Sequence, residues 1–201
     1  MKVGVLGGTF DPIHLGHLAA ADAALECAGL DRVLIMPSAS PPHRPGAVAT
    51  AEQRLAMCRL AVEGRAGLEV SDLEVSRGGR SYTVDTLSEL KRLAPGDELF
   101  LILGWDAAAL FGTWREPARI RALSSIVVVG RPGTEAPDGE QLARAGLDPG
   151  RAVLCLRPTP DISGSALRRA IAAGEPVAAK MPPAVERYIA AHGLYRDNPR
   201  S

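Results

Sequence analysis

Six short runs rich in Val, Ile and Leu recur along the chain, and segments with apolar residues at helical spacing separate most of them. The apolar residues of each run are continuous rather than alternating, which is typical of strands buried on both faces of a parallel sheet. The expected strands are Lys2–Leu6, Arg32–Met36, Leu68–Val75, Glu98–Leu103, Ser125–Val129 and Arg151–Leu156, and the expected helices are Leu18–Cys27, Ala51–Glu63, Thr83–Leu93, Gln141–Ala145, Ser163–Ala173 and Pro183–Ala191. Right-handed connections predict an α/β fold, a doubly wound parallel sheet of strand order 3-2-1-4-5-6 with C-terminal helices.

Length and charge set the expected organisation and partners. A chain of 201 residues, 46% of them hydrophobic, can bury a core and is short enough for one domain. We expect a single domain over 1–201, made of a Rossmann-like core over 1–156 and a helical segment over 157–201. Lys and Arg balance Asp and Glu at 23 each, so neither nucleic acid nor a membrane surface is favoured as a partner. The sequence does not determine the oligomeric state, and a homo-oligomer is among the states it allows.

The cysteines give an expectation about the cellular compartment. Cys27, Cys58 and Cys155 lie far apart in the sequence. An odd count at this spacing fits neither a disulfide framework nor a metal-binding CxxC pair. We therefore expect three buried free thiols in a reducing compartment. No signal-peptide pattern and no apolar stretch long enough to span a bilayer is present, so the expected location is cytoplasmic.

The expected topology predicts where a ligand binds. In doubly wound sheets, ligands bind at the carboxyl ends of the strands where the winding reverses, between the first and fourth strands. Residues 7–17 and 104–106 follow these two strands and should meet there. Gly7 and Gly8 permit a sharp turn and a close approach of phosphate to backbone amides. Neither GxGxxG nor GxxxxGK[ST] is present, and Met36-Pro37 replaces the acidic residue of dinucleotide-binding chains, which disfavours dehydrogenases and P-loop enzymes.

Two histidines stand at the start of the first expected helix. His14 and His17 are separated by one helical turn, with Gly16 between them, so both imidazoles face the same side. The helix N-terminus adds unpaired amides and a partial positive charge, which together favour a polyanion. A metal site would need a third ligand, and His43 and His192 lie in other segments. Two histidines that only begin a helix are the remaining alternative.

The motifs also carry a family resemblance. Residues 7–17, GGTFDPIHLGH, resemble the HxGH signature of the nucleotidyltransferase α/β-phosphodiesterase superfamily, and residues 162–168, ISGSALR, resemble its C-terminal motif. Between these two motifs, four further segments are similar to those of nicotinate-nucleotide adenylyltransferases, namely Pro41-Pro42-His43-Arg44, Ser81–Leu87, Gly104-Trp105-Asp106 and Trp114. The resemblance implies a nucleotidyltransferase domain that moves AMP from ATP onto nicotinate mononucleotide. The products would be nicotinate adenine dinucleotide and pyrophosphate, in a step of NAD synthesis.

The same resemblance implies roles for the matching residues. The expected catalytic residues are His14, His17 and Arg168. The expected ATP-binding residues are Gly7, Gly8, Thr9, Phe10, His14, His17, Gly104, Asp106, Ile162, Ser163, Ser165 and Arg168. The expected substrate-binding residues are Arg44, Tyr82, Thr83 and Trp114. Mg²⁺ would be carried by ATP, with no metal ligands from the protein. The reaction implied is direct in-line attack of the mononucleotide phosphate on the α-phosphorus, with no protein nucleophile.

Some of these residues have a simpler interpretation, and others depart from the family pattern. Ser163 and Asp106 precede helical runs, where Ser and Asp are common N-caps. Gly164 stands where the family usually has Ser or Thr, Trp105 replaces a smaller residue, and Arg115 replaces an aromatic one. These departures leave the choice between the acid and the amide substrate more open than the reaction type. Alternatives are an amide-preferring or phosphopantetheine adenylyltransferase, and a nucleotide-binding module without turnover.

Overall fold

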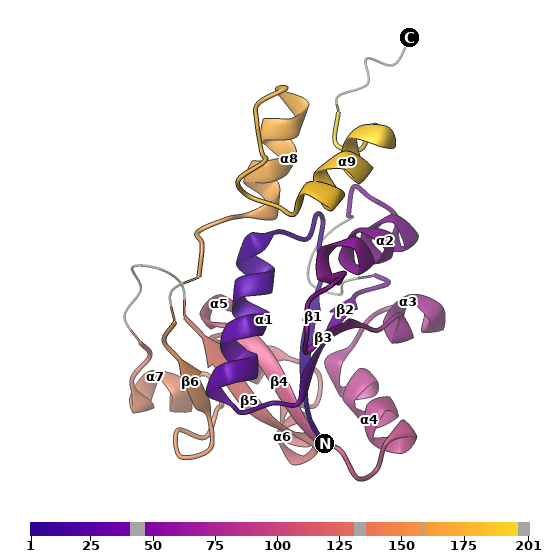
Figure 1. The fold of residues 1–201 in the computed structure, drawn as a ribbon. Coiled ribbons are helices and arrows are strands. Elements are labelled where there is room, and N and C mark those ends of the chain that lie inside the picture. Colours follow the sequence, from indigo (N-terminus) through magenta and orange to yellow (C-terminus); the bar gives the residue numbers. More distant parts are fainter. Residues whose placement is uncertain (41–46, 131–135, 158, 197–201) are drawn as a thin grey trace.

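Six parallel strands form one sheet in the computed structural model, which describes residues 1–40, 47–130, 136–157 and 159–196 (Figure 1). The strand order is β3-β2-β1-β4-β5-β6, so the predicted fold class is confirmed. The strands are β1 (Lys2–Gly8), β2 (Arg32–Pro37), β3 (Leu68–Val70), β4 (Glu98–Gly104), β5 (Ser124–Val129) and β6 (Val153–Cys155).

Helices cover both faces of this sheet. α1 (Leu15–Cys27) and α2 (Ala51–Val62) cover one face, while α8 (Gly164–Ala172) and α9 (Pro183–Ala191) join the same hydrophobic core from beyond the carboxyl ends of the strands, at the top of Figure 1. The other face carries α3 (Leu73–Arg77), α4 (Thr83–Leu93), α5 (Trp105–Ala108), the 3₁₀ turn η1 (Phe111–Thr113), α6 (Pro117–Leu123) and α7 (Gly139–Arg144). No helix in the described part of the chain has the length and apolar character needed to cross a membrane.

Alternate residues of a central strand enter opposite cores. Val33 and Ile35 of β2 pack with the first set of helices, whereas Leu34 and Met36 pack with the second. Successive side chains of a strand point to opposite faces, so a strand covered on both sides has to be apolar at every position. This requirement explains the continuous apolar runs in the sequence.

The third expected strand is wrong in its second half. β3 ends at Val70, and α3 begins at Leu73 where the sequence pattern predicted strand up to Val75. β3 is an edge strand that pairs with β2 along only three residues, so nothing extends the ladder beyond that point. The expected helices include none between β4 and β5, where α5, η1 and α6 lie. The N-cap of α5 is Gly104 rather than Asp106, which lies within the helix.

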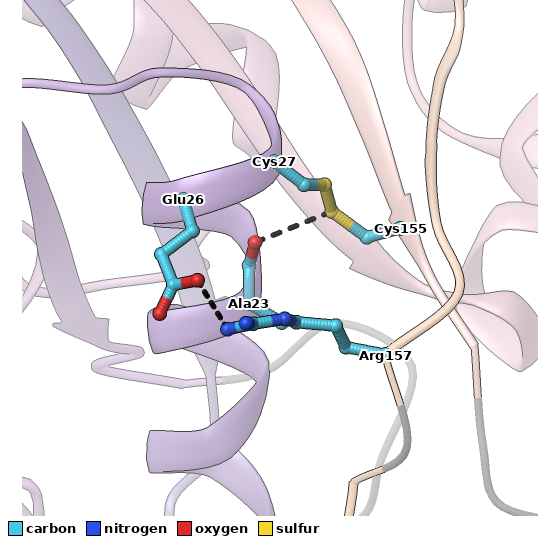
Figure 2. Close-up of a disulfide and its surroundings, with 5 residues drawn as sticks. All are labelled: Ala23, Glu26, Cys27, Cys155 and Arg157. Carbon is cyan, nitrogen blue, oxygen red and sulfur yellow. Dashed lines mark hydrogen bonds and ion pairs between the residues drawn. A yellow bond between two sulfur atoms is a disulfide. The ribbon is translucent and has the colours of Figure 1, made fainter.

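A disulfide corrects the expectation of three free thiols. Cys27, at the end of α1, is bonded to Cys155 of β6, and their Cα atoms lie 6.1 Å apart (Figure 2). Cys155 Sγ lies 3.3 Å from the carbonyl oxygen of Ala23, and Glu26 forms an ion pair with Arg157 beside it. Cys58 is free and buried. The pairing arises because α1 packs across the sheet onto its edge strand, a contact between positions 128 residues apart.

The disulfide should contribute measurably to stability. We expect the double variant Cys27→Ser/Cys155→Ser to lose about 2–4 kcal/mol of unfolding free energy, because the bond closes a very long loop in the unfolded chain. Denaturant unfolding with and without dithiothreitol measures the loss. The reductant should lower the free energy of unfolding of the wild-type protein and leave that of the variant unchanged. A thiol titration of the unreduced, denatured protein that finds three thiols instead of one would contradict the pairing.

Candidate active site

The loop between β1 and α1 depends on a glycine and an aromatic ring. Phe10 has a positive φ of 49°, and its ring lies over Gly8. A Cβ atom on Gly8 would lie 2.9 Å from Phe10 Cζ, so a larger residue could not accept this ring. The side chain of Phe10 is buried, and its ring is nearly perpendicular to the His17 ring, with the ring centroids 4.9 Å apart. The loop therefore places Phe10 directly beside the histidine pair.

The buried carboxylate of Asp11 joins this loop to two distant segments. It accepts hydrogen bonds from the backbone amides of Val48 (2.8 Å) and Ala49 (3.1 Å) and from the hydroxyl of Tyr195 (2.7 Å). Burial and the Asp11 carboxylate both raise the pKa of Tyr195, so this hydroxyl stays protonated and donates. Arg168 adds an ion pair to Asp11 at 3.7 Å. The carboxylate thus holds the segment before α2 and the C-terminal segment against the first loop.

A second buried charge, Arg54 of α2, holds the backbone from the other side. Its side chain is almost fully buried, at 1% exposed. The guanidinium donates to the carbonyl oxygens of Thr9 (2.7 Å), Ser38 (2.7 Å) and Ala49 (3.3 Å). Burial lowers the pKa of Arg54, and the nearby Asp11 carboxylate raises it. Sequence reasoning missed Arg54, since an arginine on a surface helix normally faces water.

The two histidines lie in contact at the start of α1. Their rings stack with centroids 3.6 Å apart, and the backbone amide of His14 donates to His17 Nδ1 at 3.3 Å. His14 is only 4% exposed, and burial lowers its pKa to about 4. Its buried Nδ1 atom has no hydrogen-bond partner among the described residues. At neutral pH His14 is therefore an uncharged imidazole with an unmet hydrogen-bonding atom.

The C-terminal motif lies in close contact with the backbone of the first loop. Arg168 Nη1 donates to the carbonyl oxygen of Asp11 at 2.6 Å. A Cβ atom on Gly164 would lie 3.2 Å from that same carbonyl oxygen, and one on Gly16 would lie 3.1 Å from the carbonyl oxygen of Pro160. Gly164 stands where the family usually has Ser or Thr. At this position the backbone lies so close to the Asp11 carbonyl that little room is left for a side chain. Ser163 caps α8 by accepting from the amide of Ala166 at 3.2 Å.

A basic groove of about 360 Å³ lies beside this contact. It is lined by Val48, Ser165, Arg168, Arg169, Ala172, Tyr195 and Arg196. Three arginines and a serine hydroxyl make the groove suited to phosphate oxygens. Arg169 and Arg196 were not predicted as site residues. For Arg169, its place next to Arg168 in the motif was a usable signal.

The loops after β1 and β4 reach the same edge of the sheet. Val5 of β1 pairs with Leu101 of β4, so Gly8 and Gly104, each three residues further on, end their strands at the same level. Asp106 lies in the first turn of α5, directly after Gly104. Ile162 packs at the margin of the core that also contains α1 and α8. The two segments expected to meet therefore lie on neighbouring strands.

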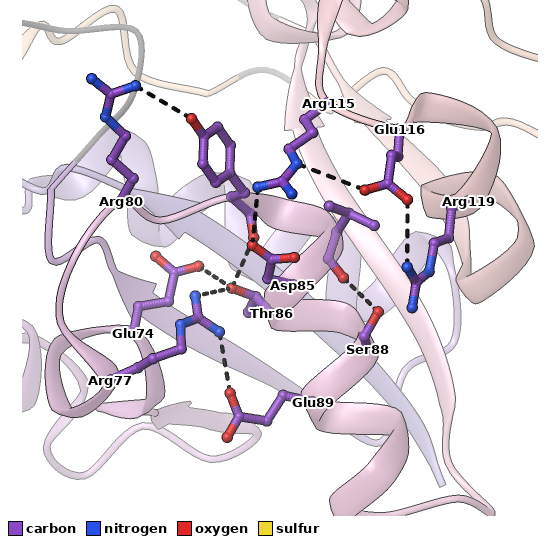
Figure 3. Close-up of polar contacts among 12 residues, drawn as sticks. Glu74, Arg77, Arg80, Asp85, Thr86, Ser88, Glu89, Arg115, Glu116 and Arg119 are labelled. Carbon is purple, nitrogen blue, oxygen red and sulfur yellow. Dashed lines mark hydrogen bonds and ion pairs between the residues drawn. The ribbon is translucent and has the colours of Figure 1, made fainter.

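Three of the expected substrate residues, Tyr82, Thr83 and Trp114, lie on the face of the sheet opposite α1. Tyr82 is the N-cap of α4, which begins at Thr83, and Trp114 follows η1 with its ring 5.8 Å from that of Phe111. The guanidinium of Arg115 lies 4.7 Å from the centroid of the Tyr82 ring (Figure 3). Tyr82 and Trp114 both pack against the same hydrophobic core. Arg44 lies outside the described residues.

The pKa of His14 predicts a pH dependence of stability. Its folded-state pKa of about 4 is below the ordinary value of 6.5, so the unfolded chain takes up a proton first as the pH falls. The free energy of unfolding should therefore drop by about 2–3 kcal/mol between about pH 7 and about pH 4.5 from this group. His14→Gln has no imidazole to protonate at this position. Its free energy of unfolding, measured in urea, should therefore fall by about 2–3 kcal/mol less than that of the wild-type protein over the same pH range. Parallel losses in the two proteins would contradict the prediction.

Comparisons with known proteins give the family. The cytidylyltransferase-like family model matches residues 5–170. A relative from Thermus thermophilus is 45% identical, over 98% of this chain and all of its own, and one from Desulfatibacillum aliphaticivorans is 41% identical, over 97% and all; both are named "probable nicotinate-nucleotide adenylyltransferase". The Plasmodium falciparum nicotinic acid mononucleotide adenylyltransferase, solved with NaAD, matches the fold with a TM-score of 0.80 at 18% identity, over 99% of each chain. The chain therefore belongs to the cytidylyltransferase-like family, among the nicotinate-nucleotide adenylyltransferases.

Proposed function

We propose that this protein transfers AMP from ATP to nicotinate mononucleotide, releasing pyrophosphate and nicotinate adenine dinucleotide in NAD synthesis. The observation that carries the proposal is the contact between the HxGH loop and the ISGSALR helix, where Arg168 binds the backbone of Asp11 beside the basic groove. The relatives described above carry the name of this activity. Residues 1–156 and 157–201 would act as one domain, because Arg168 and Tyr195 from the second part both bind Asp11 in the first.

The phosphates of ATP are proposed to lie between the start of α1 and the basic groove. Gly7, Gly8, Thr9 and Phe10 would present backbone amides and the Thr9 hydroxyl, and Ile162, Ser163, Ser165 and Arg168 would contact the phosphates from the side of α8. Only Nη1 of Arg168 is used in its contacts with Asp11, which leaves the rest of the guanidinium for an anion. Arg169 and Arg196 extend this binding surface. Gly104 and Asp106, at the end of β4, would contact adenosine.

The histidine pair has a geometry suited to the α-phosphate. His17 Nδ1 accepts from the amide of His14, so in the neutral ring the hydrogen is on Nε2, which can donate to a phosphate oxygen. His14 is uncharged at neutral pH, so its contribution is a hydrogen bond rather than a positive charge. Arg168 and the neighbouring arginines would supply positive charge near the developing pentacoordinate phosphorus. In this assignment the histidines at the start of α1 donate hydrogen bonds to the phosphate, and the arginines of α8 supply positive charge.

The chemical step needs no nucleophile from the protein. The 5′-phosphate oxygen of nicotinate mononucleotide forms the new bond to the α-phosphorus, and the bond from this phosphorus to the pyrophosphate oxygen breaks. Holding two repelling polyanions in line can supply roughly 7–11 kcal/mol of the barrier. Hydrogen bonds aimed at the charge that develops in the transition state add to this.

A divalent cation, Mg²⁺, would enter with the triphosphate and screen its charge. Across the described ranges, no group of three or more His, Cys, Asp and Glu side chains could hold a metal ion. We propose that the phosphate oxygens of ATP hold this cation, as is usual for Mg²⁺ bound with nucleotides. ATP and nicotinate mononucleotide are intracellular metabolites, and we propose that the protein acts in the cytoplasm.

The acceptor substrate would bind at the group made by α4 and the segment after η1. Trp114 could stack on the pyridine ring, a contact worth about 0.5–1.5 kcal/mol beyond burial. The backbone at Tyr82 and Thr83, in the first turn of α4, would face the substituent of that ring. Arg44 is proposed to reach the mononucleotide phosphate.

A pyrophosphate-release assay tests the reaction directly. ATP is combined in separate reactions with nicotinate mononucleotide, its amide analogue and phosphopantetheine, and the rates are compared. The expected result is turnover with the acid at a rate well above that with the other two. Faster turnover with the amide or with phosphopantetheine would replace the proposed substrate. Tight ATP binding without any turnover would instead show a nucleotide-binding module.

The role of His17 is tested by replacement. We expect His17→Ala to lower kcat by about a hundredfold or more, because it removes a hydrogen-bond donor from the α-phosphate in the transition state. His192→Ala is the matched control, since His192 stacks on Tyr188 at the end of α9 and takes no part in the proposed site. Near-normal turnover of His17→Ala would refute the assignment.

A further inference from the structure

The Cys27–Cys155 disulfide joins the supports of the two proposed phosphate-binding motifs. Cys27 ends α1, the helix that begins directly after His14, and Cys155 ends β6, the strand after which the chain continues to α8. Figure 1 shows α8 above the start of α1 and β6 beside its end. The helix that begins with the HxGH motif is therefore bonded, at its other end, to the strand that leads to the ISGSALR motif.

The described residues between β6 and α8 add weaker polar contacts to this bond. Pro160 lies against the start of α1, where a Cβ atom on Gly16 would be 3.1 Å from the Pro160 carbonyl oxygen. The Thr159 hydroxyl donates, at 3.3 Å, to the carbonyl oxygen of the residue that follows β5. Arg157 pairs with Glu26, but both side chains are more than half exposed, and such ion pairs contribute little to stability. The disulfide is therefore the strong contact at the β6 end of the connection.

The cysteines differ in accessibility to a thiol reagent. Cys27 is exposed, whereas Cys155 is only 1% exposed. Exposed disulfides are among those that thiols reduce most readily, and disulfides of cytoplasmic proteins are usually transient and redox-sensing. Cys58 is fully buried, and burial raises its pKa, which keeps it from reacting as a thiolate. An incoming thiolate should therefore reach the bond from the side of Cys27.

We infer that the Cys27–Cys155 bond is a thiol–disulfide exchange site, attacked at Cys27, whose reduction loosens α8 and weakens ATP binding. The coupling to ATP rests on the proposed function, whereas the exchange step does not. Reduction frees the β6 end of the connection, so Ser165 and Arg168 lose part of their preorganisation for the phosphates. The oxidised protein is then the form that binds ATP more tightly.

The exchange step balances with a dithiol as the reductant. One thiolate of the dithiol bonds to Cys27 Sγ, and the Cys27–Cys155 bond breaks with its electron pair on Cys155 Sγ. This sulfur takes up a proton and has an acceptor in the carbonyl oxygen of Ala23, 3.3 Å away (Figure 2). The second thiolate of the dithiol then displaces Cys27, which is protonated by water, and the dithiol leaves as a cyclic disulfide.

Peptide mass spectrometry identifies the sulfur that is attacked. Oxidised protein is treated briefly with reduced glutathione and then denatured in excess N-ethylmaleimide, which labels every free thiol. We expect the glutathione adduct on Cys27 and the maleimide label on Cys155 and Cys58. An adduct on Cys155 instead, or a disulfide that stays intact in a large excess of glutathione, would overturn the exchange site.

Calorimetric titration measures the effect on ATP binding. The dissociation constant of ATP is compared in the oxidised and dithiothreitol-reduced forms of the wild-type protein, of Cys27→Ser/Cys155→Ser and of the matched control Cys58→Ala, at a temperature where each is folded. We expect reduction to raise the dissociation constant about threefold or more in the wild-type protein and in the control. The double variant should show the weaker affinity with and without the reductant. Cys27→Ala, which cannot form the bond either, replaces the double variant if that protein does not fold.

Two results of the titration would overturn the coupling. These are an ATP dissociation constant that is the same with and without the bond, and tighter binding after reduction. If the oxidised protein binds no ATP, the proposed function fails and the coupling fails with it. The peptide analysis decides the exchange site in either case, because it does not depend on nucleotide.

Discussion

The buried carboxylate of Asp11 is the contact on which the site depends. A buried charge is tolerated only when it is hydrogen-bonded or paired, and Asp11 is both, through two backbone amides, the Tyr195 hydroxyl and Arg168. Arg54 complements it by binding the carbonyl oxygens of the same loops. Together these two charges fix the ends of β1 and β2 and the segment before α2. The loops at this edge of the sheet are thereby held by hydrogen bonds from two buried side chains rather than by regular secondary structure.

The same arrangement explains how two motifs about 150 residues apart can form one site. Close approach of backbones at Gly16 and Gly164 brings the start of α1 and the start of α8 together (Figure 1). The amide of Leu15 also binds the carbonyl oxygen of Lys180, between α8 and α9. A polyanion at this junction would meet helix-start amides, the uncharged imidazole of His14, the His17 ring and arginines within one region. Phosphoryl transfer relies on such positioning and charge more than on covalent catalysis.

Much of the fold could be predicted from the sequence, because burial on both faces forces each strand to be apolar throughout. Strand order followed from the handedness of the connections. The contents of residues 105–123 could not be predicted, since short helices such as α5 and α6 have too few turns for a clear periodicity. The Cys27–Cys155 pairing and the burial of Arg54 depend on packing between distant segments, which no local pattern encodes. The same holds for Tyr195, whose role arises from one hydrogen bond to Asp11.

The hydrogen bond between Tyr195 and Asp11 also bears on how the protein is made. It joins residues 184 positions apart, so a chain emerging from the ribosome completes most of the sheet well before the bond can form. Until Tyr195 and Arg168 arrive, the Asp11 carboxylate has lost two of its partners and the loop lacks its final support. A partly synthesised chain therefore carries the HxGH motif before the contacts that Arg168 and Tyr195 make with Asp11 can form.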